Sequence, residues 1–366
     1  MKIKSVDLFS YDLPLVAPLI LKGGTIQSRA GLILRITDDD GHVGWGEASP
    51  LPGFSREDLK QIRGELLLVK EALPDRITRD SDNVPAAIAE FIASIRIPLA
   101  SSSLFSLESA LLNLIAAARG ASPVRLLSEQ PQQEIQLNAL ITNDIDQIPE
   151  MAKRLISSGY KCVKLKVGDE DIDQDVARVK TLRESVGSSV RIRLDGNRSW
   201  TRDQASHFAG RVEAFDIEYI EEPFSSTDDI VRASEEFPLP VALDETLNQV
   251  RYIGGPDLPD AYAVVLKPTL LGGLRKITYV ARKALQKQMK VILSSSFESS
   301  IGLTMLCHIA SALGTPGAEM GLDTVKRFEI NLHRDISPLR GPMIQVSELA
   351  DYNHQLDTSL LRRVEG

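Results

Sequence analysis

Residues 162–167 read CVKLKV, and four apolar runs farther along the chain follow the same plan: VRIRLD at 190–195, IEYIEE at 217–222, VALDE at 241–245 and AVVLK at 263–267. Each run is short and rich in Val, Ile and Leu, and a longer stretch separates it from the next. This alternation is typical of parallel βαβ units. Because the C-terminal ends of such strands meet on one face of a barrel, the charged residues of these runs are expected to share an active-site face.

Three further apolar runs complete the series, at 135–141, 291–293 and, weakly, 318–320. Eight βα repeats are the number found in a closed barrel. The sequence therefore predicts an α/β fold with a (β/α)-barrel, of the modified TIM-barrel kind, over residues 126–325.

Residues 1–125 have a different pattern. Alternating polar and apolar residues over 2–13 and an apolar run at 30–36 predict strands, and the apolar stretch 104–119 predicts a helix. The first part of the chain is therefore expected to be an α+β unit. The irregular segment 326–366 is expected to return to that unit or to the barrel.

The composition is ordinary for a globular protein, with 43 % hydrophobic and 25 % charged residues. A formal net charge of −8 argues against a nucleic-acid partner, which favours a basic face. No stretch approaches the roughly 20 apolar residues of a membrane span, and residues 1–15 lack a signal-peptide core. We expect a cytoplasmic protein with a small-molecule carboxylate substrate, no nucleic-acid or membrane partner, and an oligomeric state that the sequence leaves open.

Three acidic residues at strand ends suggest a metal site. Asp195, Glu221 and Asp244 follow successive apolar runs, each about one βα unit after the last. Buried together without a cation, they would repel one another strongly. Hard oxygen ligands with no His or Cys nearby suit Mg²⁺, with Mn²⁺ possible. Such an ion leaves open positions at which a substrate carboxylate can bind.

Three lysines flank these acids. Lys164 and Lys166 are two residues apart on one strand and so share a face, and Lys267 ends a later strand. Removing a proton next to a carboxylate requires a base and strong stabilisation of the enediolate that forms. A lysine close to other cations can act as a neutral base. The set therefore predicts proton abstraction beside a metal-bound carboxylate.

This ordered set resembles the enolase superfamily, in its muconate-cycloisomerase-like subgroup. Longer motifs, GWGEASPLPGFS at 44–55, SSSFESS at 294–300 and GLDT at 321–324, resemble the o-succinylbenzoate synthase family within it. The resemblance covers nearly the whole chain and implies that residues 1–125 are a capping domain. It also implies a lyase that dehydrates 2-succinyl-6-hydroxy-2,4-cyclohexadiene-1-carboxylate (SHCHC) to 2-succinylbenzoate in menaquinone biosynthesis.

The resemblance also implies roles for the lysines. Lys166 would be the base and would then protonate the leaving hydroxide. Lys267 would stay cationic and stabilise the enediolate, and Lys164 would hold down the pKa of Lys166.

Residues around the metal would bind the rest of the substrate. Ser294 and Gly321 would offer backbone N–H groups to the succinyl carboxylate. Asn197 would contact the substrate or the water on the metal, and Arg193 would point into the barrel beneath it. The loop at 23–28 and the PLPGFS turn would close over the pocket.

Other functions remain open. An N-acylamino-acid racemase, a dipeptide epimerase or a muconate cycloisomerase of the same superfamily would need the same acids and lysines. Gly321 stands where dipeptide epimerases have the first acid of a DxD motif, which speaks against an ammonium-bearing substrate. A barrel that only binds a metal-chelated acid is a further alternative, and the lysine pair counts against it.

Overall fold

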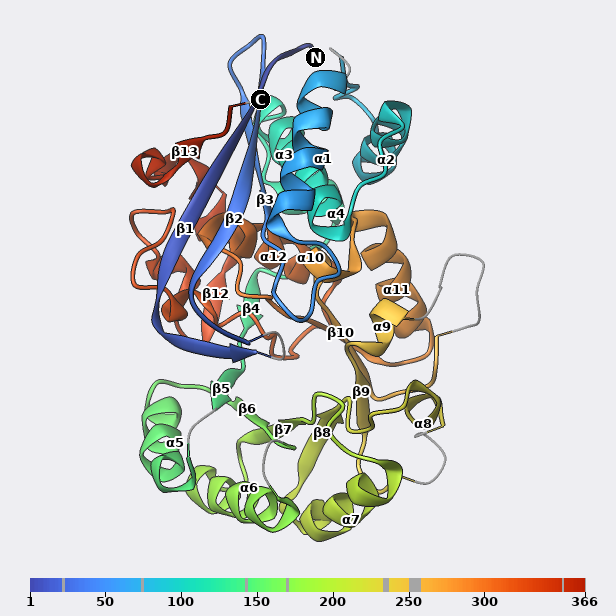
Figure 1. Cartoon of the computed structure of the whole chain (residues 1–366), viewed down its shortest axis with the longest axis vertical. Helices are drawn as coiled ribbons and strands as arrows, with labels where there is room; N and C mark the ends of the chain where they lie inside the picture. Colours follow the sequence, from blue (N-terminus) through green and yellow to red (C-terminus); the bar gives the residue numbers. More distant parts are fainter. Residues whose placement is uncertain are drawn as a thin grey trace.

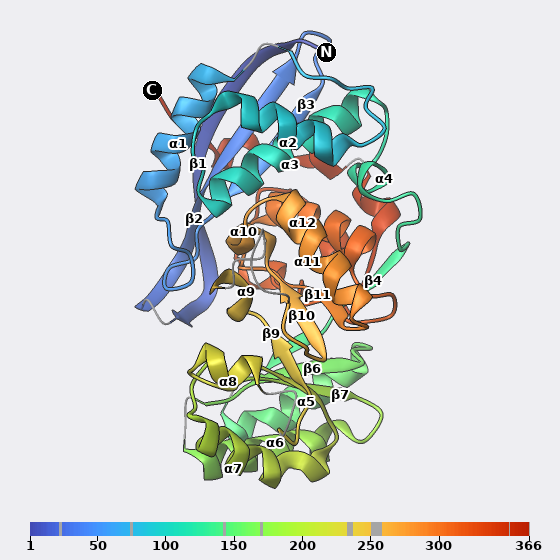
Figure 2. The same ribbon diagram turned by 90° about the vertical axis from the view of Figure 1, so that its right-hand side faces the viewer.

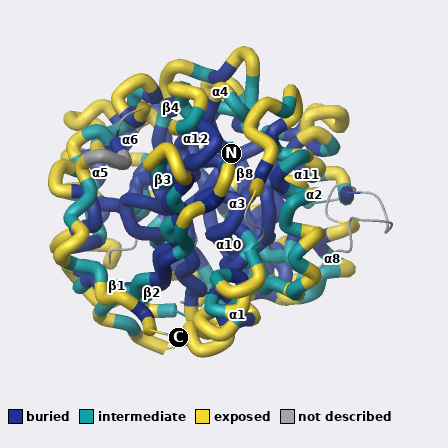
Figure 3. Tube along the Cα trace, turned by 90° about the horizontal axis from the view of Figure 1, so that it is seen from above, coloured by how far each residue is buried: buried dark blue, intermediate teal, exposed yellow. Residues whose placement is uncertain are grey.

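The computed structural model describes residues 1–21, 24–73, 76–141, 144–168, 171–232, 237–249, 258–350 and 352–365. An antiparallel sheet with helices on one face forms one end of the molecule, and a parallel barrel forms the rest (Figures 1 and 2). Seen from above, the buried part of the chain gathers in the middle and exposed segments ring it (Figure 3).

The N-terminal sheet has the order β13-β1-β2-β3. Its strands are β1 (Ile3–Leu21), β2 (Gly24–Asp38), β3 (Val43–Ala48) and β13 (Arg362–Arg363). The end of the chain thus pairs with its beginning, since Phe9 lies opposite Arg363.

The prediction of a loop at 23–28 is largely wrong. Gly23 lies outside the described residues, but β2 already begins at Gly24, and Thr25 and Ile26 pair with Ile20 and Leu19 of β1. The physical reason is that β-branched residues on both sides continue the ladder. The β1–β2 hairpin therefore reaches the barrel as regular structure (Figure 1).

Helix α3 is the core of the N-terminal unit. The helices before the barrel are α1 (Leu59–Ala72), α2 (Val84–Ile95), α3 (Ser101–Ala118) and α4 (Pro123–Leu127). By length and composition α3 could cross a membrane, but 78 % of it is buried inside the protein. It packs closely on β3, because a Cβ on Gly44 or Gly46 would lie 1.9 Å from a carbonyl oxygen of the helix.

The barrel sheet is parallel and has the order β11-β10-β9-β8-β7-β6-β5. Its strands are β5 (Ala139–Ile141), β6 (Cys162–Lys166), β7 (Arg191–Asp195), β8 (Ile217–Glu221), β9 (Val241–Leu243), β10 (Ala263–Leu266) and β11 (Lys290–Leu293). Six of the eight predicted strands therefore lie where the apolar runs placed them.

The other two predicted strands differ from expectation. The run at 135–141 is divided, because β4 (Glu134–Gln136) pairs with β12 (Met343–Gln345) and only β5 joins the barrel. The run at 318–320 forms no strand, but single parallel bridges join Met320 to Leu137 and Gly321 to Ser294. These bridges connect the two edges of the sheet and close the barrel.

Helices follow the strands around the barrel. They are α5 (Ile148–Ser157), α6 (Ile172–Val186), α7 (Arg202–Val212), α8 (Thr227–Val231), α9 (Thr246–Gln249), α10 (Pro268–Leu271), α11 (Leu274–Gln286) and α12 (Ser300–Leu313). Thr201 begins α7 with a full capping box. After the barrel, the short 3₁₀ helix η3 (Val325–Arg327) leads into the C-terminal segment. The domain boundaries at 125 and 325 stay a prediction.

Candidate active site

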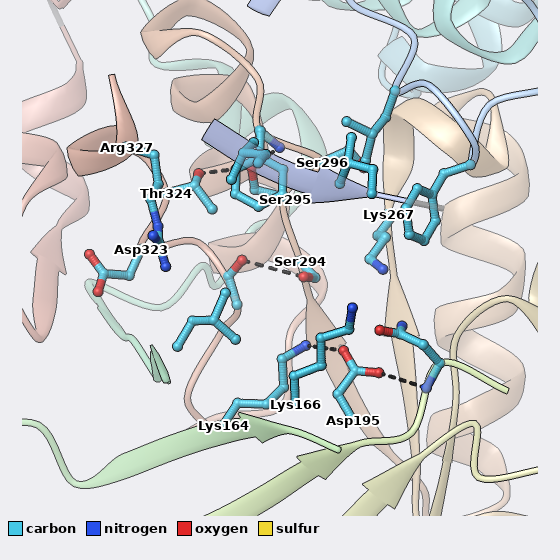
Figure 4. Close-up of a pocket in the computed structure, with 18 of the residues that line it drawn as sticks. Lys164, Lys166, Asp195, Lys267, Ser294, Ser295, Ser296, Asp323, Thr324 and Arg327 are labelled. Atoms are coloured by element: carbon cyan, nitrogen blue, oxygen red, sulfur yellow. Dashed lines mark hydrogen bonds and ion pairs between the residues drawn. The ribbon is translucent and has the colours of Figure 1, made fainter. Parts of the chain in front are cut away.

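A pocket of about 350 Å³ opens at the C-terminal ends of the barrel strands (Figure 4). Lys164, Lys166, Asp195 and Lys267 line it from the barrel. The N-terminal unit contributes residues 18–21 at the end of β1 and, from the PLPGFS turn, Leu51 and Phe54. The pocket is therefore formed jointly by the two parts of the chain.

The strand register brings the charged residues together. Lys166 on β6 lies opposite Asp195 on β7, and Asp195 lies opposite Glu221 on β8. Asp244 comes directly after β9 and Lys267 directly after β10. Because all these strands are parallel, their side chains gather at one end of the barrel, as the sequence predicted.

The three acids are buried and each contacts a lysine. Asp195, Glu221 and Asp244 are at most 8 % exposed. Lys164 Nζ lies 3.2 Å from Asp195 Oδ2 and 3.1 Å from Glu221 Oε2. Lys267 Nζ pairs with Asp244 Oδ2. The cluster therefore holds opposite charges in direct contact inside a cavity.

Burial dominates the pKa values of these acids. It raises the pKa of Asp244 to about 6, although Lys267 opposes the shift. Burial also raises the pKa of Glu221, with Lys164 opposing and the charge of Asp195 adding to the rise. For Asp195, burial is outweighed by Lys164 and Lys267, so its pKa is lowered. The lysines alone do not neutralise all three acids equally, and a divalent cation would relieve this imbalance.

The donor set fits a hard cation, though the three acids are spread apart. Among the described residues, two groups of three possible ligands lie within 4.8 Å of one another, and neither contains Asp195, Glu221 or Asp244. Lys164 and Lys267 hold the oxygens of these acids instead. Three carboxylates with no His or Cys beside them still have the ligand chemistry that Mg²⁺ requires.

The two closer groups are explained without a metal. One is Asp38, Asp40 and His42 in a turn, where Asp38 accepts hydrogen bonds from the backbone and pairs with the ring of His42. The other is Cys162, Glu218 and Glu319 inside the barrel, where Arg193 pairs with both glutamates.

Glu222 orders the loop after β9. Its carboxylate accepts hydrogen bonds from the backbone N–H groups of Asp244, at 2.8 Å, and Thr246, at 2.7 Å. Arg198 Nε donates to the same carboxylate at 2.8 Å. Glu222 therefore fixes the backbone that carries Asp244 and, as expected for a residue behind a metal ligand, does not line the pocket.

Lysines approach the pocket from two sides. Lys164 and Lys166 extend from β6 next to Asp195, and Lys267 comes from the end of β10 with its ammonium group directed toward them (Figure 4). Lys267 Nζ also lies 5.9 Å from the centre of the Phe54 ring. Lys166 and Lys267, the predicted base and the predicted stabilising cation, thus face a shared space in which a substrate can lie.

Asn197 lines the pocket and is held by the acids around it. Its backbone N–H donates to Asp195 Oδ1 at 3.2 Å, and its amide Nδ2 donates to Glu245 Oε1 at 3.3 Å. Its position agrees with the predicted contact to substrate or metal-bound water, and that contact stays a prediction.

Ser294 and Gly321 line the pocket. The prediction that their backbone N–H groups bind the succinyl carboxylate is wrong, because both groups already have partners. The backbone N–H of Ser294 donates to Leu266 O at 2.9 Å, and that of Gly321 donates to Leu293 O at 2.8 Å. Both donors are used in the hydrogen bonds that join the barrel strands. Only the Ser294 hydroxyl, which donates weakly to Gly321 O at 3.4 Å, could turn toward a ligand.

Arg193 points into the barrel beneath the acids, as expected, but the expectation that it binds substrate is corrected, because it does not line the pocket. It is fully buried, with Nε 2.7 Å from Glu218 Oε2 and Nη1 2.6 Å from Glu319 O. Since it stands two residues before Asp195 on β7, it points to the same interior face but one layer deeper. It is a core cation of the barrel and does not bind substrate.

Sequence reasoning missed two arginines in the pocket wall, Arg178 of α6 and Arg327 of η3. Neither lies at a strand end, so the pattern that located the lysines and acids carries no signal for them. Arg327 does stand close to the GLDT motif, and that proximity was the one available hint.

Comparisons with known proteins agree with this geometry. A family model described as "Enolase C-terminal domain-like" matches residues 147–349, and one described as "MenC, N-terminal domain" matches residues 3–91. o-Succinylbenzoate synthase of Klebsiella pneumoniae (strain 342) is 31 % identical over 349 residues, covering 94 % of this chain and 98 % of that protein. The enzyme of the same name from Pasteurella multocida (strain Pm70) is 30 % identical, with coverages of 94 % and 96 %.

A longer relative matches in part. Protein PHYLLO, chloroplastic, of Arabidopsis thaliana is 32 % identical over 308 residues, which are 78 % of this chain and 18 % of that protein. This chain therefore corresponds to one section of that larger protein.

Solved structures show the same fold. A dipeptide epimerase from Enterococcus faecalis V583, complexed with Mg and the dipeptide L-Leu-L-Tyr, superposes with a TM-score of 0.81 at 21 % identity, covering 94 % of this chain and 97 % of that one. An N-succinyl Arg/Lys racemase from Bacillus cereus ATCC 14579 gives 0.79 at 20 % identity, covering both chains completely. At these identities the likeness establishes the fold alone. Together with the family models and the curated relatives, it shows that this chain is a lyase-class enzyme of the enolase superfamily and belongs within it to the o-succinylbenzoate synthase family.

Proposed function

We propose that this protein is an o-succinylbenzoate synthase, which removes water from SHCHC by syn elimination to give 2-succinylbenzoate in menaquinone biosynthesis. The observation that supports this most directly is the single pocket lined by Lys164, Lys166, Asp195 and Lys267. Relatives that carry this enzyme name also match the chain along almost its full length.

Asp195, Glu221 and Asp244 would hold Mg²⁺, with Mn²⁺ as an alternative. When bound, the ion supplies positive charge that makes the proton next to the substrate carboxylate more acidic. Glu222 keeps Asp244 in place through backbone hydrogen bonds. Lys164 lies between Asp195 and Glu221 and adds a second positive charge at the same end of the pocket.

Lys166 would act as both base and acid. Its neutral amine takes the proton from the ring carbon that bears the carboxylate, and the electron pair left on that carbon expels the neighbouring hydroxyl group. The Lys166 ammonium then returns the proton to that hydroxyl, which leaves as water while the ring becomes aromatic. Because one side chain handles both steps, the proton and the hydroxyl must leave from the same face.

Lys267 would stay protonated on the other side of the substrate. Its pairing with Asp244 and its position near the Phe54 ring hold the ammonium at the pocket wall. There it can stabilise the negative charge that develops on the carboxylate and the ring.

A racemase of N-acylamino acids is the second candidate, because it would use the same lysines on opposite faces of the substrate. The complete superposition on an N-succinyl Arg/Lys racemase makes this reaction worth testing directly, although it shows the fold only. Dipeptide epimerase and muconate cycloisomerase activities are less favoured, and Gly321 stands where a dipeptide epimerase has the first acid of its DxD motif. We further propose a cytoplasmic location with no nucleic-acid or membrane partner.

The decisive assay mixes the purified protein with SHCHC and Mg²⁺ and follows the aromatic product by ultraviolet absorbance. We expect rapid turnover that EDTA abolishes and excess Mg²⁺ restores. Lys166→Ala should lower turnover by about 10²- to 10⁴-fold, the usual contribution of a general base. Lys161→Ala, an exposed lysine just before β6, is the matched control and should behave as wild type. If the wild type leaves SHCHC unchanged but exchanges the α-protons of N-acylamino acids, the racemase assignment replaces this one.

A further inference from the structure

Five cationic side chains line the pocket: Lys164, Lys166, Arg178, Lys267 and Arg327. Most have an acidic neighbour in contact. Lys164 and Lys267 pair with the acids at the strand ends, and Arg178 pairs with Asp175 at 3.1 Å. Within the part of the chain that the structure describes, no hydrogen bond or ion pair engages the guanidinium of Arg327.

The surroundings of Arg327 leave its charge available. Asp323, four residues earlier, also lines the pocket, and its Oδ2 accepts a hydrogen bond from Tyr160 at 2.9 Å and pairs with Lys326. Lys326 in turn lies 5.4 Å from the Tyr160 ring. Among the cations of the described residues, only Lys326 contacts the Asp323 carboxylate, and Arg327 acts on it electrostatically from farther away, so the guanidinium of Arg327, which is partly buried, keeps its hydrogen-bond donors available at the pocket wall.

Arg327 lies at the opposite end of the pocket from the proposed metal site. Figure 4 shows Arg327, Asp323 and Thr324 on one side, with Lys166, Asp195 and Lys267 on the other and Ser294 between them. The pocket thus has Arg327 at one end and the lysines with the proposed metal site at the other. A ligand with two carboxylates separated by a short chain would place one at each of them.

The backbone offers little alternative for a distal carboxylate. The N–H groups of Ser294 and Gly321 donate to barrel carbonyl oxygens, and that of Ser295 donates to Gly321 O. The next N–H, that of Ser296, donates to Glu298. A carboxylate at this end would remain unpaired unless a side chain supplied the donors, and a guanidinium can supply two in parallel.

We propose that Arg327 binds the second carboxylate of the substrate and thereby makes the pocket selective for dicarboxylates. This inference rests on the proposed function, since it places the succinyl carboxylate of SHCHC on Arg327 and the ring carboxylate at the acidic cluster. Arg327 acts in binding and takes no part in proton transfer.

Steady-state kinetics with SHCHC test the position of Arg327. Arg327→Met should raise KM by about ten- to a hundredfold and leave kcat within a few-fold, because a contact far from the reacting carbon is made equally in ground and transition states. Arg327→Lys should recover part of the loss. Arg340→Met makes the same change at an exposed arginine and should leave KM unchanged.

Calorimetry on the Mg²⁺-loaded protein tests the selectivity without turnover. The ligands are 2-succinylbenzoate and 2-butanoylbenzoate, which ends in a methyl group in place of the distal carboxylate. Wild type should bind the diacid at least about tenfold more tightly, and Arg327→Met should bind the two ligands alike. Unfolding curves of each variant confirm that it is folded before its affinity is compared.

The two assays separate the two proposals. If wild type converts SHCHC but Arg327→Met keeps its KM and its preference for the diacid, the inference is overturned and the synthase function stands. If wild type does not convert SHCHC but prefers the diacid only when Arg327 is present, the function fails and the inference stands. Equal binding of both ligands by wild type also overturns the inference.

Discussion

Two buried polar clusters of this protein show how differently charge can be accommodated. The first joins the N-terminal unit to the barrel around Glu47, which is 1 % exposed. Its carboxylate accepts from the backbone N–H groups of Ser299 and Gly302, both at 2.9 Å, and from the hydroxyls of Tyr11 and Ser49. All of these donors are uncharged, and Glu47 also lies at the N-terminus of α12, where a negative charge is favoured.

Arg29 makes the matching contacts from β2. It is 2 % exposed and donates to the carbonyl oxygens of Ser49, Pro50, Ser296 and Phe297, at 2.9 to 3.3 Å. Ser49 directly precedes the PLPGFS turn, Pro50 is its first residue, and the other two carbonyls belong to the SSSFESS loop. The guanidinium of Arg29 therefore joins the N-terminal unit to a loop that lines the pocket.

The second cluster, Asp195, Glu221 and Asp244 with Lys164 and Lys267, has opposite properties. Its acids are balanced by ammonium groups, and Asp195 and both lysines line the pocket. Burial raises the pKa of Glu221 and Asp244, whereas for Asp195 it is outweighed by Lys164 and Lys267, so the two lysines do not compensate the three acids equally. Charges surrounded by neutral donors hold a structure together, whereas charges opposed across a cavity are available for binding and chemistry.

The substitution Asp244→Asn is the sharpest test of the difference between the two clusters. We expect turnover of SHCHC to fall at least about a hundredfold, because changes even to residues behind a metal ligand lower metal affinity or activity by about 10–100-fold. The free energy of unfolding of the metal-free protein should change by less than about 1 kcal/mol, since the lost pairing with Lys267 is offset by removal of a buried charge. Mg²⁺ titration and urea unfolding measure the two effects. A large loss of stability with unchanged metal affinity would show that this cluster is structural.

Glu47→Ala should give the reverse result. Removing the carboxylate leaves two backbone N–H groups and several hydroxyls buried without an acceptor, so we expect a loss of about 3 kcal/mol in the free energy of unfolding. The affinity for Mg²⁺ should stay near that of wild type, because the hydrogen bonds of Glu47 go to Tyr11, Ser49, Ser299 and Gly302 and not to the acids or lysines of the second cluster. Glu71→Ala, at an exposed position of α1, is the matched control. Weakened metal binding in a stable Glu47→Ala protein would contradict the distinction between the clusters.

Glu108 is an intermediate case, a 3 %-exposed carboxylate of α3 that accepts a hydrogen bond from the backbone N–H of Leu274, at the start of α11. Burial raises its pKa from 4.5 to about 7. The folded state therefore holds this proton more tightly than the unfolded state, and the stability that Glu108 contributes below pH 4.5 is lost as the pH rises through 7.

We expect Glu108→Gln to be more stable than wild type at pH 8, by up to about 3 kcal/mol, and to match it near pH 4.5. Urea unfolding of both proteins across this range gives the difference. A variant that is less stable than wild type at pH 8 would show that the ionised carboxylate caps α11 strongly enough to outweigh its burial.

The smallest expected effect concerns the edge of the pocket. Phe54→Leu keeps an apolar side chain but removes the ring near Lys267 Nζ. A cation–π contact at a partly exposed site contributes about 0.5–1 kcal/mol, so kcat/KM should fall roughly two- to fivefold. Leu68→Ala, an exposed position of α1, serves as the control for a general change of volume. A loss of a hundredfold or more would instead mean that the ring contacts the substrate.

The sequence by itself determined the barrel and its reactive end. Parallel strands repeat at regular intervals, and a charge placed at the end of each must arrive at the same face whatever the loops do. That is why the predicted positions agree with the structure, in which Lys164, Lys166, Asp195 and Lys267 line one pocket. Glu221 and Asp244 pair with two of these lysines. The motifs likewise indicated the family to which the family models and the relatives assign the chain.

Only the tertiary structure decided which partner each polar group binds and how deeply each side chain is buried. The N–H groups of Ser294 and Gly321 are used by the strands beside them, and Arg193 lies too deep to meet a ligand. Arg327 enters the pocket only because the chain turns back after closing the barrel. Hydrogen bonds and ion pairs between distant segments depend on distances of a few ångströms, and no periodicity in the sequence records them.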